Sequence, residues 1–154
     1  MLIKLLLWLG FIAPWFSLFF MKKDSLKRYM PVAVFVSLLI TNVYEAAYTF
    51  KWWILKEYII PWGYITNTAF VYGIFFVGTL WIFYFTYRNF KVYIIVNLIV
   101  DAIFAFGLLQ LTEYLKIDRF VNLPKWGAYL IMVGLALIIY VYQRWQEGIF
   151  KEKA

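Results

Sequence analysis

The chain has 154 residues and a net charge of +7, with 66% hydrophobic and only 15% charged residues. A soluble domain of this length needs about a quarter of its residues charged, so the composition predicts a protein embedded in a membrane. The sequence contains no Cys and no His. This excludes disulfides, Cys/His zinc sites, Cys-ligated iron–sulfur clusters and c-type haem attachment, and it removes the usual general base near neutral pH.

Five apolar runs approach the roughly 20 residues that a helix needs to cross a bilayer. They predict an all-α integral membrane protein, a bundle of about five transmembrane helices in a single domain over residues 1–154. The predicted helices comprise residues 2–20, 30–50, 67–87, 92–111 and 126–142. The first run is followed by the basic residues Lys22 and Lys23 rather than by a small-residue cleavage site. We therefore expect a retained helix and not a signal peptide.

Lys and Arg are distributed unevenly between the two sides of the predicted bundle. One side carries nine: Lys22, Lys23, Lys27, Arg28, Arg88, Lys91, Arg144, Lys151 and Lys153. The other side carries six: Lys4, Lys51, Lys56, Lys116, Arg119 and Lys125. The positive-inside rule then places the N-terminus outside and the C-terminus in the cytoplasm. Because these residues lie in short loops between apolar runs, we expect the lipid bilayer as partner and no nucleic acid.

Two connectors on the predicted outer side, residues 51–66 and 112–125, are longer and semi-apolar. The first contains Trp52, Trp53 and Trp62, and the second alternates charged with apolar residues. Such segments are typical of the headgroup region, where aromatic rings lie at the interface. The sequence leaves two interpretations open: ordinary interfacial connectors, or two segments that pack together as a cap over the helix ends.

Two carboxylates lie within the predicted helices, Glu45 in the second and Asp101 near the middle of the fourth. Each has an Asn nearby, Asn42 and Asn97, and Asn97 lies one helical turn before Asp101. An ionisable residue at the centre of a bilayer costs about 2.5 to 3.5 kcal/mol on insertion scales. We predict a ligand- or ion-binding site built from these four residues. Interhelical hydrogen bonding that only stabilises the bundle is the equally weighted alternative.

Small residues in the last three predicted helices indicate positions of close helix packing. They are Gly73, Gly78, Gly107, Gly127 and Gly134.

Three segments of the second half resemble a family of small multi-spanning membrane proteins of Bacillus-type Firmicutes. They are GTLWIFYFTYRNFKVYIIVNLIVDAIFAFG (residues 78–107), NLPKW (122–126) and YQRWQE (142–147). This family has no established activity. The resemblance implies a multi-pass protein of the bacterial plasma membrane and places Asp101 inside the most recognisable segment. It implies no reaction, substrate or site residue.

The pattern favours a non-enzymatic membrane protein that acts as a binding, accessory or sensor subunit. The alternative is a small oligomeric transporter or ion or proton conductor that uses Glu45 and Asp101. A lipid-modifying enzyme ranks last, because no nucleophile–base pair or metal-ligand cluster stands out. We expect no cofactor and no metal, and leave open whether the partner is a second copy of the chain or another membrane protein.

Overall fold

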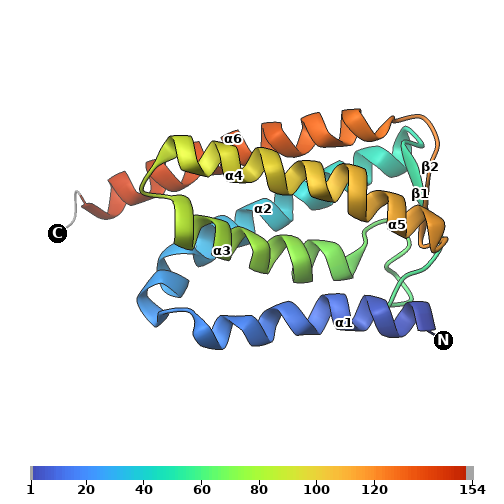
Figure 1. Cartoon of the computed structure of the whole chain (residues 1–154), viewed down its shortest axis with the longest axis horizontal. Coiled ribbons are helices and arrows are strands. Elements are labelled where there is room, and N and C mark those ends of the chain that lie inside the picture. Colours follow the sequence, from blue (N-terminus) through green and yellow to red (C-terminus); the bar gives the residue numbers. More distant parts are fainter. Residues whose placement is uncertain (1, 152–154) are drawn as a thin grey trace.

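The computed structural model describes residues 2–151, which form an all-α fold with one short two-stranded sheet. The elements in chain order are α1 (Leu2–Ser17), the 3-10 turn η1 (Leu18–Phe20), α2 (Lys23–Thr49), β1 (Trp53–Leu55), the π-helix η2 (Phe70–Phe75), α3 (Phe76–Thr86), α4 (Phe90–Ile103), the π-helix η3 (Phe104–Leu108), α5 (Leu109–Tyr114), β2 (Asp118–Phe120) and α6 (Lys125–Lys151). The helices run side by side along the long axis of the molecule (Figure 1).

Four continuous helical stretches are long and apolar enough to cross a membrane, by length and composition. They are Leu2–Phe20, Lys23–Thr49, Phe90–Tyr114 and Lys125–Ile149. The predicted third helix is present as Phe70–Thr86, but it falls below the 18 residues of the others. The prediction of an all-α chain with membrane-length helices is therefore confirmed, but four helices reach that length instead of the predicted five, because Phe70–Thr86 is shorter.

Two helices extend well beyond their predicted bounds. The second begins at Lys23 instead of residue 30, and the last continues to Lys151 instead of ending at residue 142. Apolar runs mark only the part of a helix that avoids water. The added turns are rich in Lys, Arg, Gln and Glu, which have high helix propensity and continue the helix into water.

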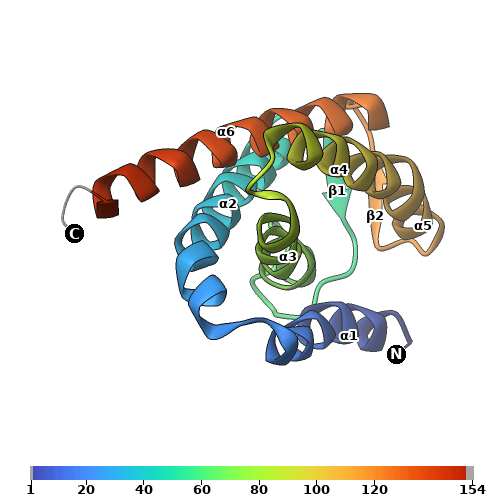
Figure 2. The same ribbon diagram turned by 60° about the vertical axis from the view of Figure 1, so that its left-hand side comes forward.

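The helix α3 lies in the middle of the bundle, with α1, α2 and α4 around it (Figure 2). Its sequence, FVGTLWIFYFT, is apolar on every side, as expected for a helix that is surrounded by other helices. Leu80 and Phe83 of α3 are fully buried, and they pack with Val32 of α2 and Tyr93 of α4. The core therefore follows the axis of α3.

The first helix, α1, packs along one side of the bundle, and Leu7 is its one buried residue among those described. Its backbone comes close to Gly73 of η2, where an added Cβ would lie 2.8 Å from the Cα of Phe11 and closer still to the carbonyl oxygen of Gly10. The Nε1 of Trp81 also donates a hydrogen bond to Ser17 Oγ at 2.8 Å. The predicted packing role of Gly73 is confirmed, because only a residue without Cβ allows this backbone contact.

The other predicted packing glycines differ from Gly73. Gly127 contacts the flexible side chain of Leu123. An added Cβ would have no neighbour within 4 Å at Gly78, Gly107 or Gly134. For these three the prediction of close helix packing within the chain is wrong, because small size alone does not say which face of a helix a neighbour covers.

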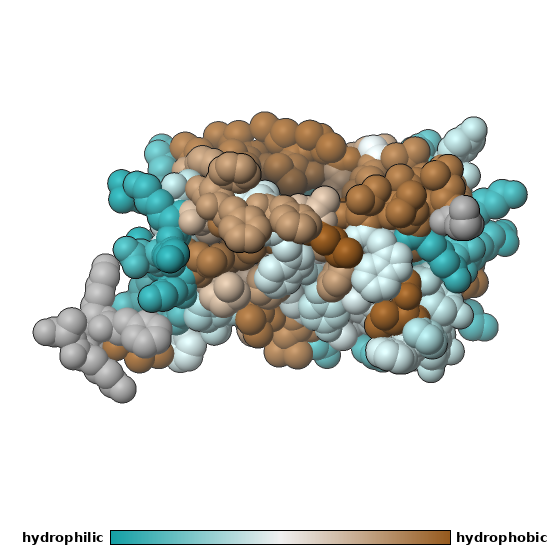
Figure 3. Space-filling view, turned by 90° about the horizontal axis from the view of Figure 1, so that it is seen from below, coloured by the Kyte–Doolittle hydropathy of each residue, from teal (hydrophilic) through white to brown (hydrophobic). Residues whose placement is uncertain are grey.

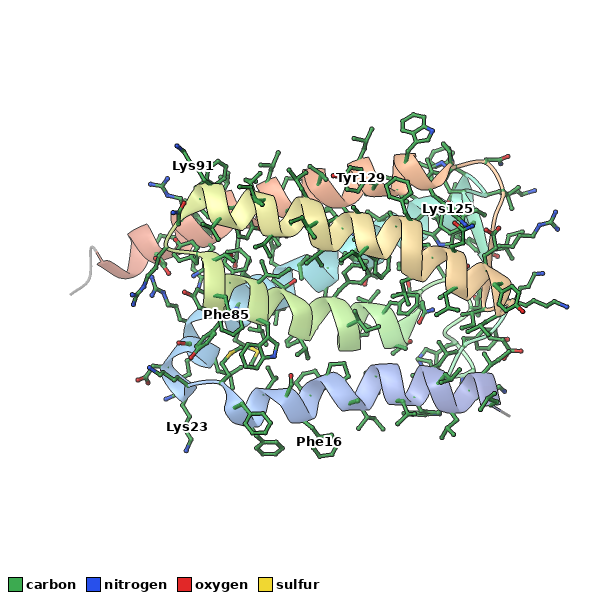
Figure 4. All side chains as sticks on the ribbon, viewed as in Figure 1. Phe16, Lys23, Phe85, Lys91, Lys125 and Tyr129 are labelled. Atoms are coloured by element: carbon green, nitrogen blue, oxygen red, sulfur yellow. The ribbon has the colours of Figure 1, made fainter. Side chains whose placement is uncertain are left out.

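The face seen in Figure 3 has a mostly apolar middle between two hydrophilic ends. Lys23 and Lys91 lie at one end, Lys125 lies toward the other, and Phe16 points outward from α1 between them (Figure 4). Large hydrophobic side chains remain exposed on every long helix, for example Phe16 on α1, and also at Phe85 near the end of the shorter α3. In water such a surface would be an association site.

The two predicted outer connectors pack together at one end of the bundle. Strands β1 and β2 pair antiparallel, with Trp53 opposite Phe120 and Leu55 opposite Asp118. Alternation along the strands leaves Ile54 exposed and directs Asp118 inward. Of the two interpretations of the connectors, the one in which they pack together is confirmed. From here on we call this end the hairpin end, after the antiparallel strand pair, although the two strands are far apart in the chain. The opposite end, where Arg28 lies, is the Arg28 end.

Candidate functional site

A pocket of about 100 Å³ lies inside the bundle, between α2, α3, α4, α6 and the β1–β2 pair. Most of its walls are apolar, with Val36, Ile40 and Met132 among them. Its polar groups come from four elements: Tyr44, Thr79, Asn97, Asp101 and Asp118. No Lys or Arg lines it in the described part of the chain. The pocket thus contains two carboxylates and no cationic side chain.

Asp101 and Asn97 are brought together as predicted, on the buried face of α4. One helical turn separates them, so they share a face of the helix. That face is covered, and the two side chains are 7% and 6% exposed. The Nδ2 of Asn97 donates to the carbonyl oxygen of Tyr93 at 2.8 Å. The Oδ2 of Asp101 is buried and has no hydrogen-bond partner among the described residues. Such an atom costs free energy unless a proton, a water molecule or a ligand satisfies it.

The Tyr93 side chain holds this face of α4 against α6. Its hydroxyl donates to the carbonyl oxygen of Ala136 at 2.7 Å. One turn and a half further along, the Tyr129 hydroxyl donates to the Leu98 carbonyl oxygen at 3.5 Å. Since α4 and α6 run antiparallel through these contacts, Asp101 lies at the level of the beginning of α6, close to Ala128.

Asp118 is the second carboxylate of the pocket, and it is 5% exposed. Its Oδ1 accepts a hydrogen bond from Thr112 Oγ1 at 3.1 Å. Burial, followed by the nearby negative charge of Glu113, raises the pKa of Asp118 to about 6, against the lowering effects of the Thr112 hydrogen bond and of Lys125. The ionised form of Asp118 is therefore under-compensated, and a cation in the pocket would stabilise it.

Sequence reasoning missed Asp118, because it lies among charged residues of a connector that was expected to be interfacial. The signal that could have found it is its spacing. In a strand, residues two apart share a face, so Asp118 shares the face of Phe120, an apolar residue.

Asn42 and Glu45 do not join the pocket, since both are exposed on another face of α2. The Nδ2 of Asn42 donates to the Leu38 carbonyl oxygen at 2.8 Å, one turn back on the same helix. Glu45 lines a separate surface depression of about 220 Å³ that also contains Trp62 and Tyr72. Four-residue steps drift by about 40° on a 3.6-residue helix. Glu45 is therefore about 80° around the helix from Ser37, a buried residue two four-residue steps earlier on α2.

A second polar cluster lies at the Arg28 end. The Nε of Arg28 donates to Glu147 Oε1, forming an ion pair. The Tyr87 hydroxyl donates to Glu147 Oε2 at 3.1 Å, and Gln143 Nε2 donates to Oε1 at 3.0 Å. The Arg28 guanidinium also lies 5.4 Å from the ring centres of Tyr29 and Tyr87. Here both carboxylate oxygens have partners.

The described residues contain no group of three or more His, Cys, Asp or Glu side chains that could hold a metal ion. What the pocket can do is bind a cation or a hydrogen-bond donor next to aromatic rings. Comparison of the chain with protein-family models, with curated proteins and with solved structures finds no match in any of the three.

Proposed function

We propose that this chain is a multi-pass protein of a bacterial plasma membrane that binds a small ligand in the pocket of Asp101. It would act as a binding, accessory or sensor subunit and not as an enzyme. The single observation that carries the binding role is the Oδ2 of Asp101, which is buried against an apolar pocket without a protein partner. A buried carboxylate inside a membrane is costly and marks a functional site by default.

The membrane location is supported by the mostly apolar middle of the face seen in Figure 3, which lies between two hydrophilic ends, and by four helices of membrane length. The proposed orientation places the Arg28 end in the cytoplasm and the hairpin end outside. Its support is the positive-inside rule, since basic residues such as Lys22, Lys23 and Lys27 are concentrated at the Arg28 end. The bacterial plasma membrane rests on the family resemblance of residues 78–107.

Conduction through a single chain is less well supported than binding. Between the pocket and the Arg28 end, the ring of Tyr93 contacts those of Phe83 and Tyr140, and Tyr29 and Tyr87 extend the cluster. Phe83 and Tyr93 are fully buried. A continuous polar path along the bundle axis would have to displace these rings. The conductor alternative therefore needs a path between chains of an oligomer.

The sequence contains no cysteine, so a single introduced thiol can report on the pocket. We would introduce Ala128→Cys, on the pocket wall, and expose the reconstituted protein to the small neutral reagent methyl methanethiosulfonate. Modification detected by intact mass supports an accessible pocket. The matched control is Tyr114→Cys, at a position 82% exposed. A thiol at position 128 that stays unmodified while the control reacts fully contradicts a ligand pocket.

The same proteoliposomes separate binding from conduction. We expect no proton or cation flux above that of empty vesicles. Flux that is present in the wild type and lost in Asp101→Asn would contradict the binding role and establish the conductor. Orientation is tested with Lys23→Cys, which we expect to resist a membrane-impermeant thiol reagent added to intact cells. Its labelling from outside would reverse the proposed topology.

A further inference from the structure

The two pocket carboxylates come from two different elements, α4 and β2, which are separated in the chain by η3 and α5. Both are more than nine-tenths buried. Because no Lys or Arg lines the pocket in the described chain, an anionic ligand would meet repulsion without compensation. A positively charged ligand would be attracted to both carboxylates. The negative charge of the pocket walls therefore favours a ligand with a positive charge.

The remaining walls are poor in ligands for a metal ion. Calcium takes six to eight oxygen ligands, and magnesium needs a near-octahedral set. Beside the two carboxylates, the pocket offers the side-chain oxygens of Asn97, Thr79 and Tyr44. Most of the other lining residues are aliphatic or aromatic. A bare metal ion would lose more hydration than this pocket restores.

Aromatic rings line the pocket on two sides. On the hairpin side, Trp53 lies 5.4 Å from Tyr44 and 5.6 Å from Phe120, measured between ring centres. On the bundle side, Phe75 and Phe104 are 4.7 Å apart. All five side chains are pocket residues. Aromatic faces attract organic ammonium ions through the quadrupole of the ring, and such faces recognise quaternary ammonium ligands in proteins.

We infer that the pocket binds a small organic ammonium group, with the carboxylates of Asp101 and Asp118 as counter-ions and the rings of Trp53 and Phe104 among its walls. This inference rests on the proposed binding function and names its ligand class. A pocket of about 100 Å³ is of the same order as the engineered cavity of about 150 Å³ that takes up benzene. It therefore has room for a methylated ammonium head.

The test uses the full chain in micelles with Ala128→Cys and three thiol reagents of similar size. They are 2-aminoethyl methanethiosulfonate, which is cationic, the anionic 2-sulfonatoethyl analogue and the neutral methyl reagent. Rates are divided by those at Tyr114→Cys to remove intrinsic reactivity. We expect the cationic reagent to exceed the anionic one by about tenfold or more at position 128. In the background of Asp101→Asn with Asp118→Asn, this preference disappears.

A second measurement needs no change to the carboxylates. Tetramethylammonium is added while the neutral reagent modifies the Ala128→Cys thiol, with tert-butanol as an uncharged comparison and Ca²⁺ and Na⁺ as metal comparisons. We expect tetramethylammonium alone to slow the modification, by about fivefold at saturation. This measurement remains valid even if the double carboxylate variant fails to fold. Size-exclusion elution would reveal such a failure.

The outcomes separate the two proposals. If no reagent reaches the thiol, the binding function itself fails. If all three reagents react equally and tetramethylammonium gives no protection, the pocket is accessible and the ammonium inference is overturned. Protection by Ca²⁺ or Na⁺ without protection by tetramethylammonium also overturns it, in favour of a metal ion.

Discussion

The hairpin end and the Arg28 end each place carboxylates beside aromatic rings, but the carboxylates accept different numbers of hydrogen bonds at the two ends. At the Arg28 end, Glu147 accepts hydrogen bonds from Arg28, Tyr87 and Gln143. At the hairpin end, Asp118 accepts one side-chain hydrogen bond, from Thr112. One oxygen of Asp101 has none in the described chain. A saturated carboxylate stabilises the fold, whereas an unsaturated one remains available to a ligand.

The difference follows from where the cations lie. Arg28 lies in the first turns of α2, and its guanidinium pairs with Glu147 in the last turns of α6. At the hairpin end, Lys125 pairs with Glu113 at 2.9 Å rather than with either pocket carboxylate. The basic residues of the connectors thus remain outside the pocket, which keeps its charge negative.

The largest expected effect concerns the pH dependence of Asp118. Its pKa is raised from 3.8 to about 6 in the folded protein, so the folded state binds the proton more tightly than the unfolded state. The corresponding stability is fully present below about pH 4 and is lost as the pH rises through about 6. A shift of about two units corresponds to roughly 3 kcal/mol.

Thermal unfolding in micelles between pH 4 and pH 8 checks this. We expect wild-type stability to fall more steeply with rising pH than that of Asp118→Asn, with Asp24→Asn as the exposed-carboxyl control. Asp24 lies in the charged first turn of α2. Equal pH profiles for the wild type and Asp118→Asn would show that the carboxylate at the hairpin end is as well compensated as Glu147, and the comparison would collapse.

A scaffold variant separates stability from pocket chemistry. We expect Gly73→Ala to destabilise the protein by about 2 kcal/mol, because its Cβ would overlap the backbone of α1 near Phe11. Gly78→Ala is the matched control: nothing lies within 4 Å, and Ala favours the helix. No described residue of α1 lines the pocket, so the reagent preference at the Ala128→Cys thiol should survive Gly73→Ala. Its loss would mean that any weakening of the fold erases the preference.

At the Arg28 end we expect a smaller loss of stability. Glu147→Gln removes the charge that Arg28, Tyr87 and Gln143 share, and we expect destabilisation by about 1 to 2 kcal/mol. The Arg28 side chain is 45% exposed, and solvent screening keeps the value at this level. Thermal unfolding measures it, with Glu45→Gln as the exposed control. A change no larger than that of the control would mean that the saturated network adds nothing to the fold.

The sequence predicted the apolar helices well because their signal is one-dimensional: a run of apolar residues needs no knowledge of neighbours. The sequence did not predict correctly which face of each helix is buried. Glu45 and Asp101 each have an Asn at short spacing, yet α2 turns Glu45 outward while α4 turns Asp101 inward. Which face of a helix is covered depends on packing with other helices, and packing is not encoded in local spacing.

The pairing of the two connectors illustrates the same limit. The sequence identifies both as semi-apolar and leaves their joint packing as one of two interpretations. Their register, with Leu55 opposite Asp118, joins residues more than sixty positions apart in the chain and depends on where α2 and α5 end. Asp118 becomes a pocket residue only through that register, so the second half of the site could not be derived from residue types alone.

The smallest stability effect, and the sharpest test of the comparison, is Asp101→Asn. Its Oδ2 has no partner in the described chain, so removing the charge breaks no hydrogen bond at that atom and relieves a burial cost. We expect the unfolding free energy to change by less than about 1 kcal/mol, or to rise. In the same variant, protection of the Ala128→Cys thiol by tetramethylammonium should fall severalfold. If Asp101→Asn instead destabilised the protein as much as Glu147→Gln, with protection unchanged, Asp101 would belong with the structural carboxylate of the Arg28 end and not with a binding site.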